Sequence, residues 1–86
     1  MKKPKKTRKP PVRNDKLLKE FGNNLRKIRK HKGITQEELA FKIGLEISQI
    51  SRIERGILNS TISTAYEIAS ALNVDLKDLF DFSKKD

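Results

Sequence analysis

Apolar side chains recur at steps of three and four residues through most of the chain after residue 16. In the first such stretch they are Leu17, Leu18, Phe21, Leu25 and Ile28. Charged and polar side chains take most of the remaining positions, so the pattern predicts an amphipathic helix over residues 16–31. Gly33 follows at the position where a glycine commonly ends a helix.

Two short helices joined by a tight turn are predicted next. Thr35 and Glu38 have the spacing of a capping box at the start of the first helix. Gly44 ends that helix after about two turns. The following helix has about nine residues and ends at Gly56. Its apolar positions are Ile47, Ile50 and Ile53.

A fourth and a fifth helix complete the pattern. After a polar loop at residues 59–61, apolar residues again follow a helical stripe. They are Ile62, Ala65, Tyr66, Ala69 and Leu72. Asp75 and Asp78 can cap a short fifth helix. Because no segment shows the alternation of a strand, the predicted fold class is all-α, a compact bundle of five short helices.

The composition narrows the choice of partner. A net charge of +9, with 36% charged residues, favours binding to polyanions, with nucleic acid first and an anionic membrane second. The chain has no cysteine, which excludes disulfides and thiolate metal sites. The longest apolar run, Leu39 to Phe41, is far shorter than the ~20 residues of a membrane span. We therefore expect a cytoplasmic, nucleoid-associated protein with no membrane partner.

The positive charge is concentrated at the N-terminus. Residues 1–16 contain eight of the 20 lysines and arginines and one acid, a net charge of +7, and all three prolines. Val12 is almost the only apolar residue there, so the segment cannot build a core. We expect a disordered basic arm at 1–16, a DNA-binding domain at 17–82 and a polar tail at 83–86. The arm could follow phosphates or enter a minor groove, or it could be only a solubilising tail.

The predicted third helix has side chains that can read DNA bases. Its short connection to the second helix makes the two cross steeply, as in motifs that place the second helix in the major groove. With the buried isoleucines turned inward, Arg52 can bond guanine, Gln49 can pair with adenine and Ile47 can meet a thymine methyl group. The alternative is an ordinary solvated helix face.

Residues 35–56, TQEELAFKIGLEISQISRIERG, resemble the helix-turn-helix of the phage repressor and Cro-type (Xre-like) family, and the resemblance extends from Leu25 to Phe80. It implies a lambda-repressor-like fold and a sequence-specific regulator of transcription, bacterial or phage-encoded. It implies base contacts by Ile47, Ser48, Gln49 and Arg52. With the free N–H groups at a helix start, it indicates phosphate contacts at Thr35, Gln36, Arg55, Asn59 and Ser60. We expect repression, because a short protein that occupies DNA can block polymerase without further surfaces.

The resemblance also implies an ion pair between Arg29 and Glu54, since a buried carboxylate needs a cationic partner. It further implies a homodimer on palindromic double-stranded DNA with half-sites about 10 bp apart. The candidates for the dimer interface are the apolar residues near the C-terminus, although Phe82 could equally close the core. They are Val74, Leu76, Leu79, Phe80 and Phe82.

No pattern indicates catalysis, a cofactor, a metal site or a small-molecule substrate. His31, the single histidine, lies in a lysine-rich helix end with no nearby acid, and Ser48 and Ser51 have no histidine at a recognisable spacing. A competing function is a protein-interaction module, such as an antitoxin or a coactivator-like adaptor with secondary DNA binding. A third alternative is nonspecific binding of RNA or membrane by the arm alone.

Overall fold

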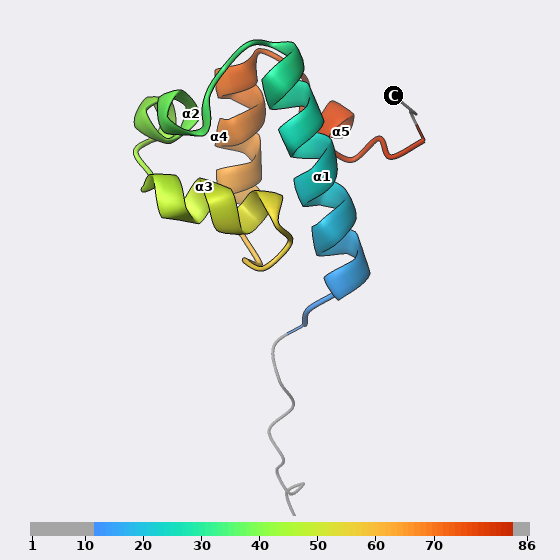
Figure 1. Cartoon of the computed structure of the whole chain (residues 1–86). Coiled ribbons are helices and arrows are strands. Elements are labelled where there is room, and N and C mark those ends of the chain that lie inside the picture. Colours follow the sequence, from blue (N-terminus) through green and yellow to red (C-terminus); the bar gives the residue numbers. More distant parts are fainter. Residues whose placement is uncertain (1–11, 84–86) are drawn as a thin grey trace, which may run out of the picture.

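The computed structural model describes residues 12–83, which form five helices and no strand. The helices are α1 (Asp15–His31), α2 (Gln36–Ile43), α3 (Ile47–Glu54), α4 (Ile62–Leu72) and α5 (Leu76–Leu79). Helix α4 lies between α2 on one side and α1 with α5 on the other, and α3 crosses one end of the bundle (Figure 1). The predicted all-α fold is therefore confirmed.

The ends of α1 and α2 follow signals in the local sequence. Thr35 accepts a hydrogen bond from the Glu38 N–H, and the Glu38 side chain accepts one from the Thr35 N–H. Gly33 and Gly44 have φ angles of 71° and 74°, which glycine adopts without the strain that a side chain would add. The predicted capping box and both glycine stops are therefore present.

Helix α1 begins two residues before the predicted domain boundary. Asn14 is its N-cap, and its side chain accepts a hydrogen bond from the Leu17 N–H. Asp15 and Lys16, which the charge pattern assigned to the arm, therefore belong to the helix, because a capping asparagine can start a helix before its first apolar residue. The rest of the predicted arm up to residue 11, and residues 84–86 of the predicted tail, lie outside the described range.

The core collects aliphatic side chains from all five helices. Its largest fully buried members are Leu25, Leu39, Ile50, Ile53, Ile68, Leu72 and Leu79. Each such side chain stabilises the fold by about 1.5–3 kcal/mol relative to an exposed one. No helix between residues 12 and 83 is long and apolar enough to cross a membrane.

The buried face of α4 differs from the predicted stripe at two positions. Ile62 is 81% exposed and Tyr66 is 58% exposed, whereas Ile68 is fully buried beside Ala65 and Ala69. The apolar residues of this helix satisfy two overlapping stripes, and packing against the neighbouring helices selects one of them. Ile62 and Tyr66 are left on the molecular surface.

Two residues of α1 fix its neighbours. A Cβ atom on Gly22 would lie 2.3 Å from the Ile53 carbonyl oxygen and 2.5 Å from that of Glu54, so only glycine lets α1 approach the end of α3 this closely. Asn24 donates from Nδ2 to the carbonyls of Asp78 and Leu79, at 2.9 and 2.8 Å, and so holds α5 in place. No local pattern in the sequence indicates either role, because both residues act through distant parts of the chain.

Candidate nucleic-acid interface

Helices α2 and α3 are held in a fixed arrangement by their buried sides. Leu39 of α2 and Ile50 and Ile53 of α3 are fully buried in the same core. Gly44 turns the chain between the helices, and Leu45 of the turn packs against the core. Helix α3 is therefore fixed at one end of the bundle with one face outward (Figure 1).

The outward face of α3 carries three of the four predicted base-contacting residues. Ile47 is 49% exposed, and Ser48 and Arg52 are also exposed. The Arg52 side chain has no hydrogen bond or ion pair with any residue in the described range. Its guanidinium can therefore meet guanine O6 and N7 without giving up a partner in the protein.

Gln49, the fourth predicted base-contacting residue, is half-buried and engaged at the start of α3. Its Oε1 atom accepts a hydrogen bond from the Glu46 N–H at 2.9 Å. This bond satisfies a backbone donor at the beginning of the helix, a role that capping side chains often have. The Gln49 Nε2 atom has no acceptor among residues 12–83.

A buried network connects three helices behind this face. Arg29 donates from Nε and Nη2 to the two carboxylate oxygens of Glu54, at 2.5 and 3.0 Å, and from Nη1 to the Ile34 carbonyl at 2.8 Å. The side chains of Arg29 and Glu54 are 8% and 2% exposed. Gln36 donates from Nε2 to Glu54 Oε1 at 2.9 Å. The pair that the resemblance implied therefore also joins the first residue of α2.

The start of α2 retains groups that can bind an anion. The capping box uses the N–H groups of Thr35 and Glu38, and those of Gln36 and Glu37 have no acceptor within the described chain. Free N–H groups at a helix start attract phosphate. The Gln36 Nε2 atom already donates one hydrogen to Glu54, so only its second hydrogen is left for a phosphate.

The other predicted phosphate contacts lie on and after the end of α3. Arg55 is exposed and donates from Nε to Ser51 Oγ at 3.2 Å. Asn59 donates from Nδ2 to the Val12 carbonyl at 3.0 Å, and Arg13 donates from Nη2 to the Ile57 carbonyl at 2.8 Å. The chain just before α1 is thereby attached to the loop after α3, an attachment that no local pattern in the sequence indicates.

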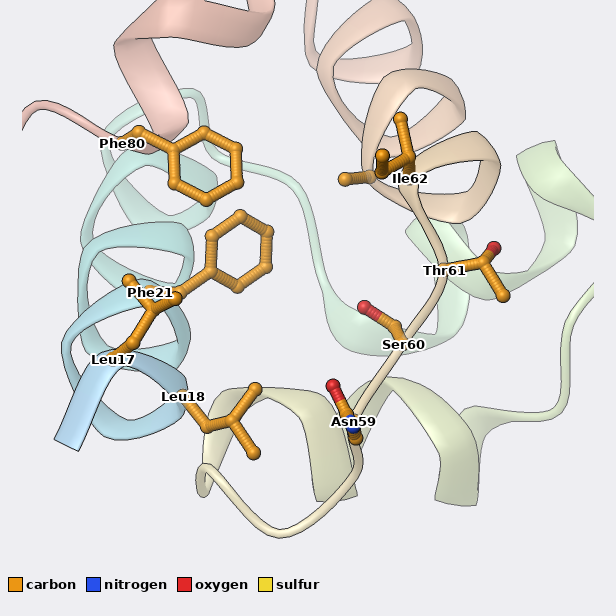
Figure 2. A pocket seen from close by; sticks show the side chains of 9 residues that line it. Leu17, Leu18, Phe21, Asn59, Ser60, Thr61, Ile62 and Phe80 are labelled. Carbon is orange, nitrogen blue, oxygen red and sulfur yellow. The ribbon is translucent and has the colours of Figure 1, made fainter. Parts of the chain in front are cut away.

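An apolar hollow opens between the start of α1, this loop and the start of α4 (Figure 2). Its lining residues are Leu17, Leu18, Phe21, Asn59, Ser60, Thr61, Ile62, Ala65 and Phe80. The rings of Phe21 and Phe80 pack against each other at one side, with centroids 5.0 Å apart, and Ile62 faces the hollow from α4 (Figure 2). Ser60, a predicted phosphate contact, is half-buried in this lining.

The predicted dimer-interface residues differ in exposure. Phe80 is 44% exposed beside the hollow, whereas Leu79 is fully buried. Val74, Leu76 and Phe82 are half-buried and pack against the core. Leu79 therefore cannot meet a partner, and Phe82 is used at least partly to cover the core.

Comparison with known proteins identifies the family of this chain and some of its relatives. The sequence profile of the HTH_3 helix-turn-helix family matches residues 25–79. Control protein C.BamHI of Bacillus amyloliquefaciens is 44% identical over 64 residues, which are 73% of this chain and 79% of that protein. The HTH-type transcriptional regulator y4dJ of Sinorhizobium fredii is 41% identical over 63 residues, 73% of this chain and 82% of that protein.

A solved structure extends the similarity to three dimensions. The crystal structure of the restriction-modification controller protein C.AhdI from Aeromonas hydrophila matches with a TM-score of 0.72 and 40% identity, and the match covers 73% of this chain and 96% of that one. The similarity therefore includes both fold and sequence, and the residues that match the family profile include α2 and α3. The chain belongs to the HTH_3 helix-turn-helix family of DNA-binding transcriptional regulators.

Proposed function

We propose that this protein binds a palindromic operator as a homodimer, reads it with α3 in the major groove and represses transcription there. The observation that carries the proposal is the outward face of α3, where Arg52 is exposed and free of protein partners within the described chain. Ile50 and Ile53 hold this helix from behind, so its outward face has a fixed orientation. Arg52 bonds guanine, and Ile47 meets a thymine methyl group.

Backbone contacts would fix the position of α3 on the duplex. The free N–H groups at the start of α2 and the exposed Arg55 at the end of α3 are suited to phosphates on either side of the groove. Gln36 can add a contact with its remaining amide hydrogen. Asn59 and Ser60 are weaker candidates, because Asn59 already holds Val12 and Ser60 lines the apolar hollow.

The second copy would bind at the apolar hollow. Ile62, Phe80 and Leu17 line it, and they are 81%, 44% and 37% exposed. Ile62 both lines the hollow and protrudes at its edge, so a nearby two-fold axis would place the Ile62 of each copy against the hollow of the other. In this arrangement the main dimer contact lies at the start of α4. Of the apolar residues near the C-terminus that were predicted to form the interface, Phe80 takes part.

The basic N-terminal segment would add phosphate contacts. Val12 and Arg13, which we call its anchor, are hydrogen-bonded to the loop that follows α3. The segment therefore starts beside the proposed DNA face. Residues 1–11 contain six lysines and arginines and no acid. Such a segment neutralises phosphates independently of base sequence.

The first genes to test are suggested by the relatives. C.AhdI is a restriction-modification controller protein and C.BamHI is a control protein, so we place this chain's operator in the promoter region of restriction-modification genes. Repression follows from position, because a dimer bound over a promoter excludes polymerase.

Selection of sites from a random duplex pool at about 150 mM salt tests the proposal. A palindrome with half-sites about 10 bp apart is the expected result. Uniform, salt-sensitive binding with no enriched sequence would contradict it. That outcome would favour a protein-interaction module, for which the exposed Phe41 of α2, at 88%, would be the first surface to test.

A further inference from the structure

The capping role of Gln49 restricts how this residue can read a base. A glutamine pairs bidentately with adenine by accepting from the N6 amino group and donating to N7. In this structure the Gln49 Oε1 atom already accepts the Glu46 N–H at 2.9 Å. The orientation of the amide is settled by its partner, because a backbone N–H can only donate and must therefore face the oxygen.

We infer that Gln49 reads the operator only as a hydrogen-bond donor, through Nε2, and that it selects guanine over adenine. The inference rests on the proposed function, since it concerns the base chosen by the same helix. Guanine presents two acceptors, O6 and N7, on its major-groove edge, and the two hydrogens of Nε2 have no acceptor in the described chain and can meet them. Adenine has only one acceptor on this edge, N7, for the Nε2 hydrogens. Cytosine presents its N4 amino group there, which is a donor and cannot accept from Nε2.

Reading adenine would require the cap to be broken. Rotating the amide toward adenine would remove the acceptor from the Glu46 N–H at the start of α3. The typical contribution of a capping bond corresponds to about a five-fold penalty in affinity. Binding to guanine keeps the Gln49–Glu46 bond and carries no such penalty. The capping bond therefore adds to the preference for guanine over adenine.

Two substitutions separate the acceptor from the donor. Gln49→Glu keeps an oxygen for the Glu46 N–H but has no hydrogen to donate, and Gln49→Met removes both functions. Ser70→Ala, at an exposed position near the end of α4, is the control. Circular dichroism and thermal melting of all variants establish that α3 is still folded.

Site selection is carried out on the wild type and the three variants at equal salt. We expect one guanine in each wild-type half-site to become cytosine, or to lose its preference, with Gln49→Glu. Binding of Gln49→Glu to the wild-type site should weaken by about 5- to 150-fold. Replacing that guanine with 7-deazaguanine, which lacks N7, should weaken the wild type several-fold and leave Gln49→Glu unchanged.

Three results would overturn the inference. The first is that the position altered by Gln49→Glu is an adenine whose replacement by purine, which lacks the N6 amino group, weakens wild-type binding. The second is that no position responds to either Gln49 substitution more than to Ser70→Ala. Both leave the operator-binding function intact. The third, no enriched site for the wild type at all, would remove that function and the inference with it.

Discussion

Arg52 and Gln36 occupy the same motif but differ in what already holds them. The Arg52 guanidinium is free of partners in the described chain, whereas the Gln36 amide is bonded to the buried Glu54 carboxylate. A side chain without a partner on an exposed helix face can form hydrogen bonds that depend on the base it meets. A side chain that is already bonded within the protein can contribute only a contact that is the same on every sequence. At the scale of single residues, we therefore expect Arg52 to discriminate between bases and Gln36 to help fix the position of the protein on the duplex.

Substitution of these two residues should give different patterns of loss. Arg52→Ala is expected to lose about 1–3 kcal/mol of discrimination at one base pair, because it removes a bidentate contact to guanine. Gln36→Ala should weaken binding to all sequences alike. Titration of each variant against the operator and its single-base variants checks both, and equal weakening on every sequence for Arg52→Ala would exclude Arg52 as a base reader.

The Arg29–Glu54 pair should be important for stability. Arg29→Ala is expected to lower the free energy of unfolding by about 3–5 kcal/mol, because it leaves the Glu54 carboxylate buried without its partner. Arg26→Ala, on the exposed side of α1, should change it by less than about 0.5 kcal/mol. Urea unfolding measures both variants.

A second variant tests whether burial of an unpaired charge is the cause. Replacing Arg29 and Glu54 together with methionine removes both charges and should restore much of the stability that Arg29→Ala removes. A double variant as unstable as the single one would show that the network stabilises through its geometry instead.

At the scale of helices, the angle of α3 depends on a contact with α1 that needs the absence of a side chain. Gly22 lies against the last carbonyl groups of α3, where even a methyl group has no room. Because these atoms belong to backbone, neither helix can yield by turning a side chain. The outward face of α3 is therefore positioned partly by a residue that could not itself contact DNA.

Gly22→Ala should destabilise the protein although alanine favours helices. We expect a loss of about 1–3 kcal/mol from the overlap with α3, which corresponds to a fall in Tm of roughly 4–8 °C for each kcal/mol. Asn23→Ala, at the exposed next position, is the control and should have a near-zero effect. Differential scanning calorimetry gives both values. A stabilised Gly22→Ala variant would mean that α1 and α3 do not pack this closely in solution.

At the scale of the whole molecule, charge and apolar surface lie on different segments. The N-terminal segment holds most of the excess positive charge, and its anchor attaches it to the loop after α3. Three of the exposed apolar residues, Leu17, Ile62 and Phe80, instead line the hollow at the start of α4. DNA affinity and self-association should therefore respond to separate changes.

Removal of residues 1–11 should reduce both affinity and salt dependence. The deletion keeps Val12 and Arg13, so the attachment to the loop after α3 is preserved. The slope of log K against log salt should become shallower by about 0.9 for each phosphate that the segment neutralises in the full chain. Operator titrations at several salt concentrations measure the slope, and an unchanged slope would show that the segment does not contact DNA.

Ile62→Glu should weaken the dimer. Placing a charge in the apolar contact should raise the dimer dissociation constant by about 10- to 100-fold, since a buried isoleucine contributes about 1.5–3 kcal/mol. Phe41→Glu changes an equally exposed apolar residue of α2 and should leave association unchanged. Sedimentation equilibrium compares the two variants, and equal effects, or none, would place the dimer interface elsewhere.

Helix ends and family membership could both be predicted from the amino-acid sequence. Capping residues and glycine stops act between positions three or four apart, so Thr35, Glu38, Gly33 and Gly44 predicted the ends of α1 and α2. The motif in residues 35–56 was enough to identify a DNA-binding regulator. Its resemblance to known regulators also paired Arg29 with Glu54, which periodicity alone could not have done.

Only the packed structure shows which side chains are buried or already bonded to another part of the protein. Whether α4 buries Ile62 or Ile68 depends on packing, since both fit a helical stripe. The bonds of Gln36 to Glu54 and of Asn59 to Val12 join residues 18 and 47 positions apart, and Gly22 matters only because α3 folds back against it. Local sequence cannot encode such contacts position by position, because they exist only after the helices have packed.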